Sequence, residues 1–146
     1  MVDSAASAVI REYIKAWPDD YETLGRLRTP DYVEDWPQSR ERVRGDANYR
    51  AIHEAYPGGL PQSLVERVSG TPEQWAVSPM FTLVHLTGAG STFTVEGTLR
   101  YPDGTEYKAI AVIGLKGDRV AWQRSYFAPI TEAPAWREQW VERTTD

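Results

Sequence analysis

The sequence predicts an α+β fold in which N-terminal helices cover one face of a curved antiparallel sheet formed by the C-terminal half of the chain. The first observation is the segment Met80–Ala128, where β-branched, aromatic and aliphatic runs alternate with three glycine-containing turns, at 88–90, 102–104 and 116–118. Glycine and aspartate adopt the positive φ angles of hairpin turns, so four strands in an antiparallel meander are expected here. The second observation is the 3.6-residue apolar period of the preceding residues, which is typical of helices.

Composition and charge narrow the possible functions. The 146 residues are enough for one domain, 1–146, with a sizeable core. A net charge of −5 argues against nucleic acid as a partner, because phosphates bind concentrated basic surfaces. The chain has no cysteine and two histidines, so no thiolate or histidine-rich metal site is expected, although carboxylates could still hold a hard cation. No apolar run approaches the length of a membrane span and no secretory signal is evident, so a cytoplasmic protein without membrane contact is expected.

The first helix is expected over residues 4–17, and Pro18 ends it. One face of this helix carries its large apolar residues, namely Val9, Ile10, Tyr13, Ile14 and Trp17. Tyr13 has two interpretations. It is either an aromatic core residue or a residue whose hydroxyl points into a cavity, since a buried hydroxyl needs a partner.

Shorter helices are expected over 19–28, 46–56 and 135–142, with a strand over 63–69. In the helix over 46–56, His53 shares a face with Tyr49 and Tyr56. Imidazole titrates near neutral pH, so His53 is either the base of a pocket or a residue of the core. Between the second and third helices, Tyr32-Val33 opens a short strand, and the arginines at 40, 42 and 44 form either a solvated loop or the rim of a pocket.

Three stretches resemble the nuclear transport factor 2-like superfamily, in its SnoaL-like and ketosteroid-isomerase-like branch. They are the helix residues 9–17, the sequence Val-Glu-Asp-Trp-Pro at 33–37 running into 42–45, and the ending at 117–120 with the aromatic pair at 126–127. The resemblance covers most of the chain. It implies a conical α+β half-barrel with a deep apolar pocket, and homodimers through the outer sheet face are common in this superfamily. Its members have many chemistries, so the resemblance does not fix a function.

Ketosteroid isomerases have three catalytic positions that can be compared with this chain. The oxyanion-hole tyrosine of the first helix corresponds to Tyr13. The general base is an aspartate directly before a proline, whereas here Trp36 separates Asp35 from Pro37. Because successive strand residues point to opposite faces, either Asp35 or Trp36 faces the pocket. The second oxyanion donor, an aspartate in the family, is replaced by Ala111.

Glu96 is a candidate replacement for that missing acid. If Asp103-Gly104 forms a two-residue hairpin loop, Glu96 lies opposite Ala111 and could act as an acid or base within the apolar cone. A longer loop would shift the register and remove this role. The alternative is that Glu96 pairs with Arg100 or Arg124 on an outer, solvated or dimer-facing surface.

The resemblance also implies a set of residues that line the pocket. On the last strand, either Trp122, Arg124 and Tyr126 point inward, or Gln123, Ser125 and Phe127 do, and the resemblance favours the second set. The expected lining residues are Trp17, Trp36, Tyr49, His53, His85, Gln123 and Phe127.

Three functions remain open. The first is a cofactor-independent isomerase, cyclase or related enzyme, in which Asp35 removes a proton next to a carbonyl of an apolar small molecule and Tyr13 donates to the oxyanion. The second is a non-catalytic module that binds an apolar ligand or a partner. The third is an epoxide hydrolase, suggested by Arg100 with Glu96 on one strand and by the neighbours Asn48 and Tyr49.

Overall fold

The computed structural model describes residues 5–69 and 92–144 of the chain. Two helices, α1 (Ala5–Ala16) and α2 (Tyr21–Leu27), precede the first two strands, β1 (Arg28–Trp36) and β2 (Glu41–Arg44). Helix α3 (Gly45–Glu54) leads into β3 (Gln62–Ser69), and the chain then continues with β4 (Thr92–Arg100), β5 (Glu106–Lys116) and β6 (Arg119–Pro129). A 3₁₀ helix, η1 (Ala135–Trp140), follows the last strand.

The described strands form one curved sheet in the order β2-β1-β6-β5-β4-β3. Strands β3 to β6 pair antiparallel with their neighbours, and so do β1 and β2. Strand β1 pairs with β6 in parallel, which makes the sheet mixed rather than purely antiparallel. This pairing places the inward side chain of Glu34 on β1 beside that of Gln123 on β6.

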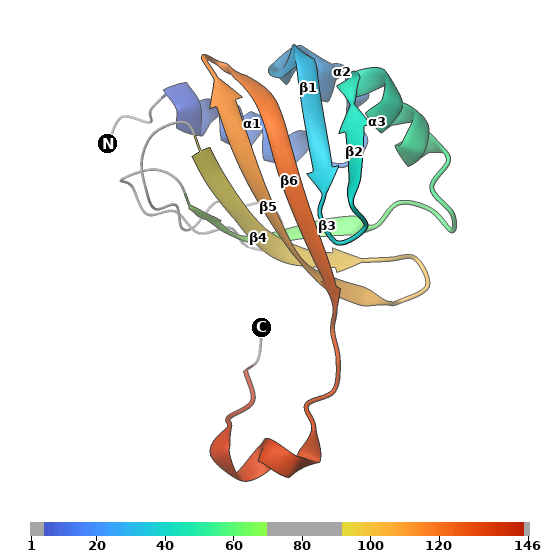
Figure 1. The fold of residues 1–146 in the computed structure, drawn as a ribbon, viewed down its shortest axis with the longest axis vertical. Helices are drawn as coiled ribbons and strands as arrows, with labels where there is room; N and C mark the ends of the chain where they lie inside the picture. Colours follow the sequence, from blue (N-terminus) through green and yellow to red (C-terminus); the bar gives the residue numbers. More distant parts are fainter. Residues whose placement is uncertain (1–4, 70–91, 145–146) are drawn as a thin grey trace.

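The three N-terminal helices cover one face of the sheet, and the opposite face of the sheet carries no helix among the described residues (Figure 1). Ile10, Tyr13 and Ile14 of α1 are buried against the inward side chains of the sheet, as the apolar period predicts. Of Asp19 and Asp20, which both precede the second helix, Asp20 is the cap, and its carboxylate accepts a hydrogen bond from the backbone N–H of Thr23. The layers therefore form an α+β half-barrel that is open at one end.

Other expectations differ in detail from the structure. Strands β4, β5 and β6 account for three of the four strands expected over Met80–Ala128, and the first of the four lies outside the described residues. The expected strand at Tyr32-Val33 is longer and lies inside the sheet, because β2 occupies the edge beside it. No described helix is both long and apolar enough to cross a membrane.

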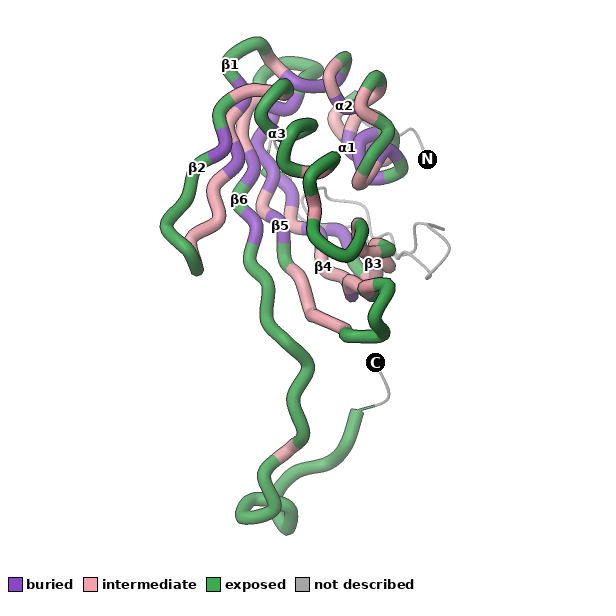
Figure 2. Tube along the Cα trace, turned by 90° about the vertical axis from the view of Figure 1, so that its right-hand side faces the viewer, coloured by how far each residue is buried: buried purple, intermediate pink, exposed green. Residues whose placement is uncertain are grey.

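The C-terminal segment leaves the end of β6 and points away from the rest of the molecule (Figure 2). The helix expected over 135–142 is the short 3₁₀ helix η1. Trp136 and Trp140 are 73% and 69% exposed, so this helix does not pack against the described core.

Candidate functional site

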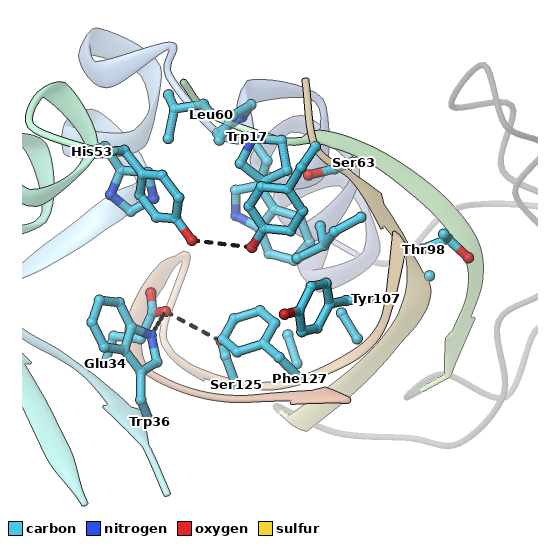
Figure 3. A pocket seen from close by; sticks show the side chains of 18 of the residues that line it. Trp17, Glu34, Trp36, His53, Leu60, Ser63, Thr98, Tyr107, Ser125 and Phe127 are labelled. Carbon is cyan, nitrogen blue, oxygen red and sulfur yellow. Dashed lines mark hydrogen bonds between the residues drawn. The ribbon is translucent and has the colours of Figure 1, made fainter. Parts of the chain in front are cut away.

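A cavity of about 880 Å³ lies between the helices and the concave face of the sheet. The side chains that line it come from α3, from the connection after α3, and from strands β1 and β3 to β6 (Figure 3). Most of its aromatic lining comes from Trp17, Trp36, Tyr49, Tyr56, Tyr101, Tyr107 and Phe127. The volume is within the range of natural small-molecule sites.

Strand β1 points Glu34 and Trp36 into the cavity and Asp35 away from it. Glu34 is 4% exposed and lines the cavity with Trp36. Asp35 accepts two hydrogen bonds from the guanidinium of Arg42, at 2.6 and 3.0 Å. Arg42 is the register partner of Asp35 on β2, so this ion pair belongs to the outer face. Of the two alternatives in the sequence, the structure adopts the one in which Trp36 faces the cavity, and the acid on that face is Glu34.

Three donors hold the carboxylate of Glu34. The hydroxyl of Tyr32 donates to Oε1 at 2.9 Å. The indole N–H of Trp36 donates to Oε2 at 2.6 Å, and the hydroxyl of Ser125 donates to the same oxygen at 3.3 Å. Figure 3 shows Glu34, Trp36 and Ser125 together at one end of the cavity. A carboxylate has about four acceptor positions, so roughly one position, on Oε1, is left for a ligand.

A directed chain of hydrogen bonds leads from Arg28 to this carboxylate. Arg28 Nε donates to the hydroxyl of Tyr13 at 3.0 Å, and Tyr13 donates to Gln123 Oε1 at 2.9 Å. The amide nitrogen of Gln123 then donates to Ser125 Oγ at 2.9 Å, and Ser125 donates to Glu34. Each hydrogen bond in the chain is donated in the direction of Glu34. The chain therefore fixes the rotamers of the side chains around the acid.

Tyr13 is a member of this chain rather than part of the cavity wall. It is fully buried, and burial raises the pKa of its phenol above the ordinary value while the charge of Arg28 opposes that rise. Its single hydroxyl hydrogen is used by Gln123. Tyr13 therefore positions Gln123, and it is not among the described residues that line the cavity.

His53 lies on the α3 side of the cavity and stacks on Tyr49, with ring centroids 3.8 Å apart. Its Nδ1 is 2.8 Å from the carbonyl oxygen of Tyr49. A carbonyl only accepts, so Nδ1 carries the hydrogen, and the neutral ring leaves Nε2 as an acceptor. Burial lowers the pKa of His53 below its ordinary value, which favours this neutral form.

Two tyrosines join the helical layer to the sheet beside the cavity. The hydroxyls of Tyr56, after α3, and Tyr101, after β4, are 3.0 Å apart. Tyr107 of β5 packs edge-on against Tyr101. One hydroxyl of the pair donates to the other, so the second hydroxyl hydrogen remains available to a ligand.

The turn between β4 and β5 decides the position of Glu96. Tyr101 and Thr105 close a three-residue loop, and Gly104 within it has a φ of +88°. The register therefore pairs Glu96 with Ile110. The expected pairing of Glu96 with Ala111 is wrong by one residue, because the loop is one residue longer than a two-residue hairpin loop. Glu96 forms an ion pair with Arg67 on the outer face and does not line the cavity, so the outer position of the alternative is found but its partner is neither Arg100 nor Arg124.

Six of the seven expected lining residues do line the cavity, namely Trp17, Trp36, Tyr49, His53, Gln123 and Phe127. His85 lies outside the described residues. On β6, the set with Gln123, Ser125 and Phe127 is the inward one. Ala111 also lines the cavity, so the second acid of the isomerases is absent from this position.

The residues suggested for an epoxide hydrolase do not meet in the cavity. Arg100 pairs with Glu106, while Glu96 pairs with Arg67. Asn48 donates to the backbone carbonyl of Arg44 at an exposed position. In the described part of the chain there is no group of three or more metal-ligating side chains.

Sequence reasoning missed Glu34 and Arg28 as members of the site, whereas Ser125 belongs to the set on the last strand that the resemblance favours as inward. A signal for Glu34 was present, because it lies two residues before Trp36 and so shares the face of a residue expected in the pocket. Arg28 gave no such signal. It is buried because its guanidinium lies over the rings of Tyr49 and Tyr32, 3.9 and 4.2 Å from their centroids, and this clustering requires the folded chain.

Comparisons with known proteins identify the fold. No family model and no curated protein matches the sequence. An NTF2-like protein of unknown function from Burkholderia xenovorans has a similar structure, with a TM-score of 0.72 and 23% identity over 96% of this chain and 95% of that chain. A proposed ketosteroid isomerase from Kribbella flavida gives a TM-score of 0.73 and 22% identity, over 97% and 91% of the two chains.

A proposed SnoaL-like polyketide cyclase from Shewanella denitrificans is similar at a TM-score of 0.63 and 16% identity, over 86% of this chain and 91% of that chain. These three proteins carry different descriptions on one architecture. At such low identity the similarity concerns the fold and leaves the chemistry open. The chain has the nuclear transport factor 2-like fold, as the resemblance in its sequence predicts.

Proposed function

We propose that the cavity binds an apolar small molecule and that Glu34 is the general base of a cofactor-independent proton transfer, as in an isomerisation or cyclisation. The observation that carries this proposal is Glu34, the one buried carboxylate among the described residues, on a largely apolar wall and held by Tyr32, Trp36 and Ser125. A general base must meet the substrate proton in a fixed orientation, and these three donors provide it. The similar structures described as a ketosteroid isomerase and a polyketide cyclase support this class of chemistry.

The substrate carbonyl would need a donor for its developing negative charge. Tyr13 and Ala111 do not supply one, because the first is enclosed and the second is apolar. The hydroxyl pair of Tyr56 and Tyr101 lines the same cavity and has one hydrogen to donate. We assign the oxyanion contact to this pair.

The test compares Glu34→Gln with Asp35→Asn, two adjacent carboxylates that face opposite sides of β1. A panel of steroid enones, polyketide-like ketones and epoxides is screened first for thermal stabilisation of the wild-type protein and then for turnover. Glu34→Gln is expected to lower kcat by at least about a hundredfold while ligand-induced stabilisation remains, since the amide keeps the shape but does not take a proton. Asp35→Asn keeps both properties. Wild-type turnover in Glu34→Gln would contradict the proposal.

Non-catalytic binding is the second candidate. It is favoured by the three donors that already occupy Glu34, because the one acceptor position left on Oε1 can accept a hydrogen bond from a ligand and orient it without any proton transfer. In that case a ligand from the panel would stabilise the wild type, and no compound of the panel would be converted by wild type or variants.

A further inference from the structure

The C-terminal arm, residues 130–144, is the largest described part of the chain that does not pack on the body. Beyond Ile130, whose backbone N–H donates to the carbonyl of Glu106, its residues are exposed except for half-buried Ala133. Ile130, Trp136, Trp140 and Val141 are between 44% and 73% exposed. An exposed pair of tryptophans of this size is typical of a surface that is covered by a partner.

The shape of the arm also indicates that something supports it. Helix η1 has six residues in 3₁₀ geometry, and such a helix is rarely stable without packing. Pro129 and Pro134 bracket the linker before it, and Pro134 is extended, with φ −65° and ψ 139°. Because proline fixes φ, these residues direct the arm away from its own sheet, as Figures 1 and 2 show. Among the described residues no part of the body packs on η1, which is the position expected of a segment that another molecule supports.

The same chain has an uncovered apolar surface that matches the arm. This outer strip consists of Ile110, Val112, Trp122 and Tyr126 of β5 and β6, which alternate with inward residues such as Ala111 and Gln123, although Ile110 also borders the cavity. Ile110 and Tyr126 are register partners and are 42% and 43% exposed. Trp122 lies flat over Gly114, since a Cβ on that glycine would come within 2.0 Å of its ring. The flat indole extends the strip across both strands.

The charges of the two surfaces are complementary. The arm carries the carboxylates Glu132, Glu138 and Glu142 against two arginines. Beside the strip, Arg124 faces outward between Trp122 and Tyr126, next to its register partner Asp35 on β1, which forms an ion pair with Arg42. An arm lying on the strip would therefore bring aromatic groups onto apolar ones and carboxylates near a cation.

We infer that the C-terminal arm docks on the outer strip of a second copy of this chain, and that two copies exchange arms. A second copy supplies both missing surfaces at once, because each chain has one arm to donate and one strip to cover. Reciprocal exchange closes the assembly as a two-fold dimer. The inference goes beyond direct pairing of outer sheet faces, in which the strips would meet each other and the arms would remain exposed.

The test is sedimentation velocity of the full chain at concentrations from about 1 to 100 μM. The wild type is expected to be a dimer. Trp136→Ser with Trp140→Ser is expected to raise the dimer dissociation constant at least about a hundredfold, because each tryptophan loses a large buried area. The conservative pair Trp136→Phe and Trp140→Phe retains most of the affinity. The melting temperature of the serine variant is compared with that of the wild-type monomer at low concentration. An unchanged value shows that the domain of the variant is still folded.

A mixing experiment separates arm exchange from direct pairing of the sheet faces. The serine arm variant is mixed with a strip variant, Ile110→Lys with Tyr126→Lys. Neither variant alone forms the wild-type dimer, but the mixture has one intact arm and one intact strip and is expected to form a heterodimer. A monomeric wild type, an arm variant that dimerises as tightly as the wild type, or a mixture that remains monomeric would each overturn the inference.

Discussion

Arg28 is the buried cation of this fold, and its contacts explain why the interior around the site is ordered. Its side chain is about 1% exposed and lies over the rings of Tyr13, Tyr32 and Tyr49. Nη1 donates to Asp46 at 2.7 Å, while Nε donates to Tyr13. Cation–π contacts and two hydrogen bonds offset part of the loss of water around the guanidinium, while its buried Nη2 makes no hydrogen bond to the described residues.

Replacing Arg28 by leucine is expected to lower the free energy of unfolding by at least about 2 kcal/mol. The physical reason is that the buried hydroxyl of Tyr13 loses its donor and Asp46 loses its partner. Urea denaturation measures the change. Arg50→Leu is the matched control, because Arg50 also lies over a tyrosine ring but is exposed, and it should leave the unfolding midpoint nearly unchanged. Equal effects of the two variants would contradict this account.

The free energy of unfolding should depend on pH through His53, and the direction of the change follows from the pKa of this residue. Burial lowers the folded-state pKa below the ordinary value of 6.5, so the unfolded chain binds a proton more readily. The stabilisation is fully present above pH 6.5 and is lost as the pH falls from there through the folded-state pKa. His53→Gln should flatten the dependence of the free energy of unfolding on pH in this window, measured by urea titrations at several pH values. A variant with the wild-type slope would show that His53 is not the titrating group.

Glu34 illustrates how far sequence reasoning reaches at the scale of one residue. The sequence places the stretch 33–37 beside the pocket. The residue inserted before Pro37 leaves open whether Asp35 or Trp36 points into it. Pairing with β2 and β6 on both sides fixes that parity, and these contacts are remote in sequence. The acid therefore had to be identified from the folded chain.

At the scale of elements, local patterns predicted most helices and hairpins because their signals lie within a few residues. The apolar face of α1 and the glycine turns are examples. The register between β4 and β5 was harder, since Pro102-Asp103-Gly104 fits both a two-residue and a three-residue loop. The structure has the longer loop, and this one-residue difference moves Glu96 relative to β5.

Gly104 tests that turn directly. Its φ of +88° lies in the left-handed region, and a Cβ there would meet no atom within 4 Å. The cost of Gly104→Ala is therefore conformational and is expected to be about 1 kcal/mol of unfolding free energy. Gly104→Asn should cost less, because asparagine tolerates this region. Thermal or urea unfolding that gave alanine no cost would contradict the three-residue turn.

At the scale of the whole molecule, the cavity sets which ligands are acceptable. Its described lining contains the carboxylates Glu34 and Asp103 and no lysine or arginine. Burying an anion near Glu34 is unfavourable because no cation compensates for it. A neutral steroid ketone should therefore stabilise the protein more than its hemisuccinate ester, measured by thermal shift at pH 7. The reverse order would contradict the proposed polarity of the site.

The whole fold was predictable because helices, turns and strand composition agree with one architecture. The role of the arm was not, since the sequence shows the spacing of Trp136 and Trp140 but not the surface that they face. The fold alone also leaves the reaction open, because function depends on the residues in the cavity. The central claim is thus that Glu34 exchanges a proton with a bound substrate.

Deuterium incorporation tests this claim most directly. A ketone that stabilises the wild-type protein is incubated with it in D₂O, and exchange at the carbon next to the carbonyl is followed by proton NMR. Wild type and Asp35→Asn should exchange this hydrogen at similar rates, whereas Glu34→Gln should lower the rate by at least about a hundredfold. Exchange by Glu34→Gln at the wild-type rate, with the ligand still bound, would contradict the account.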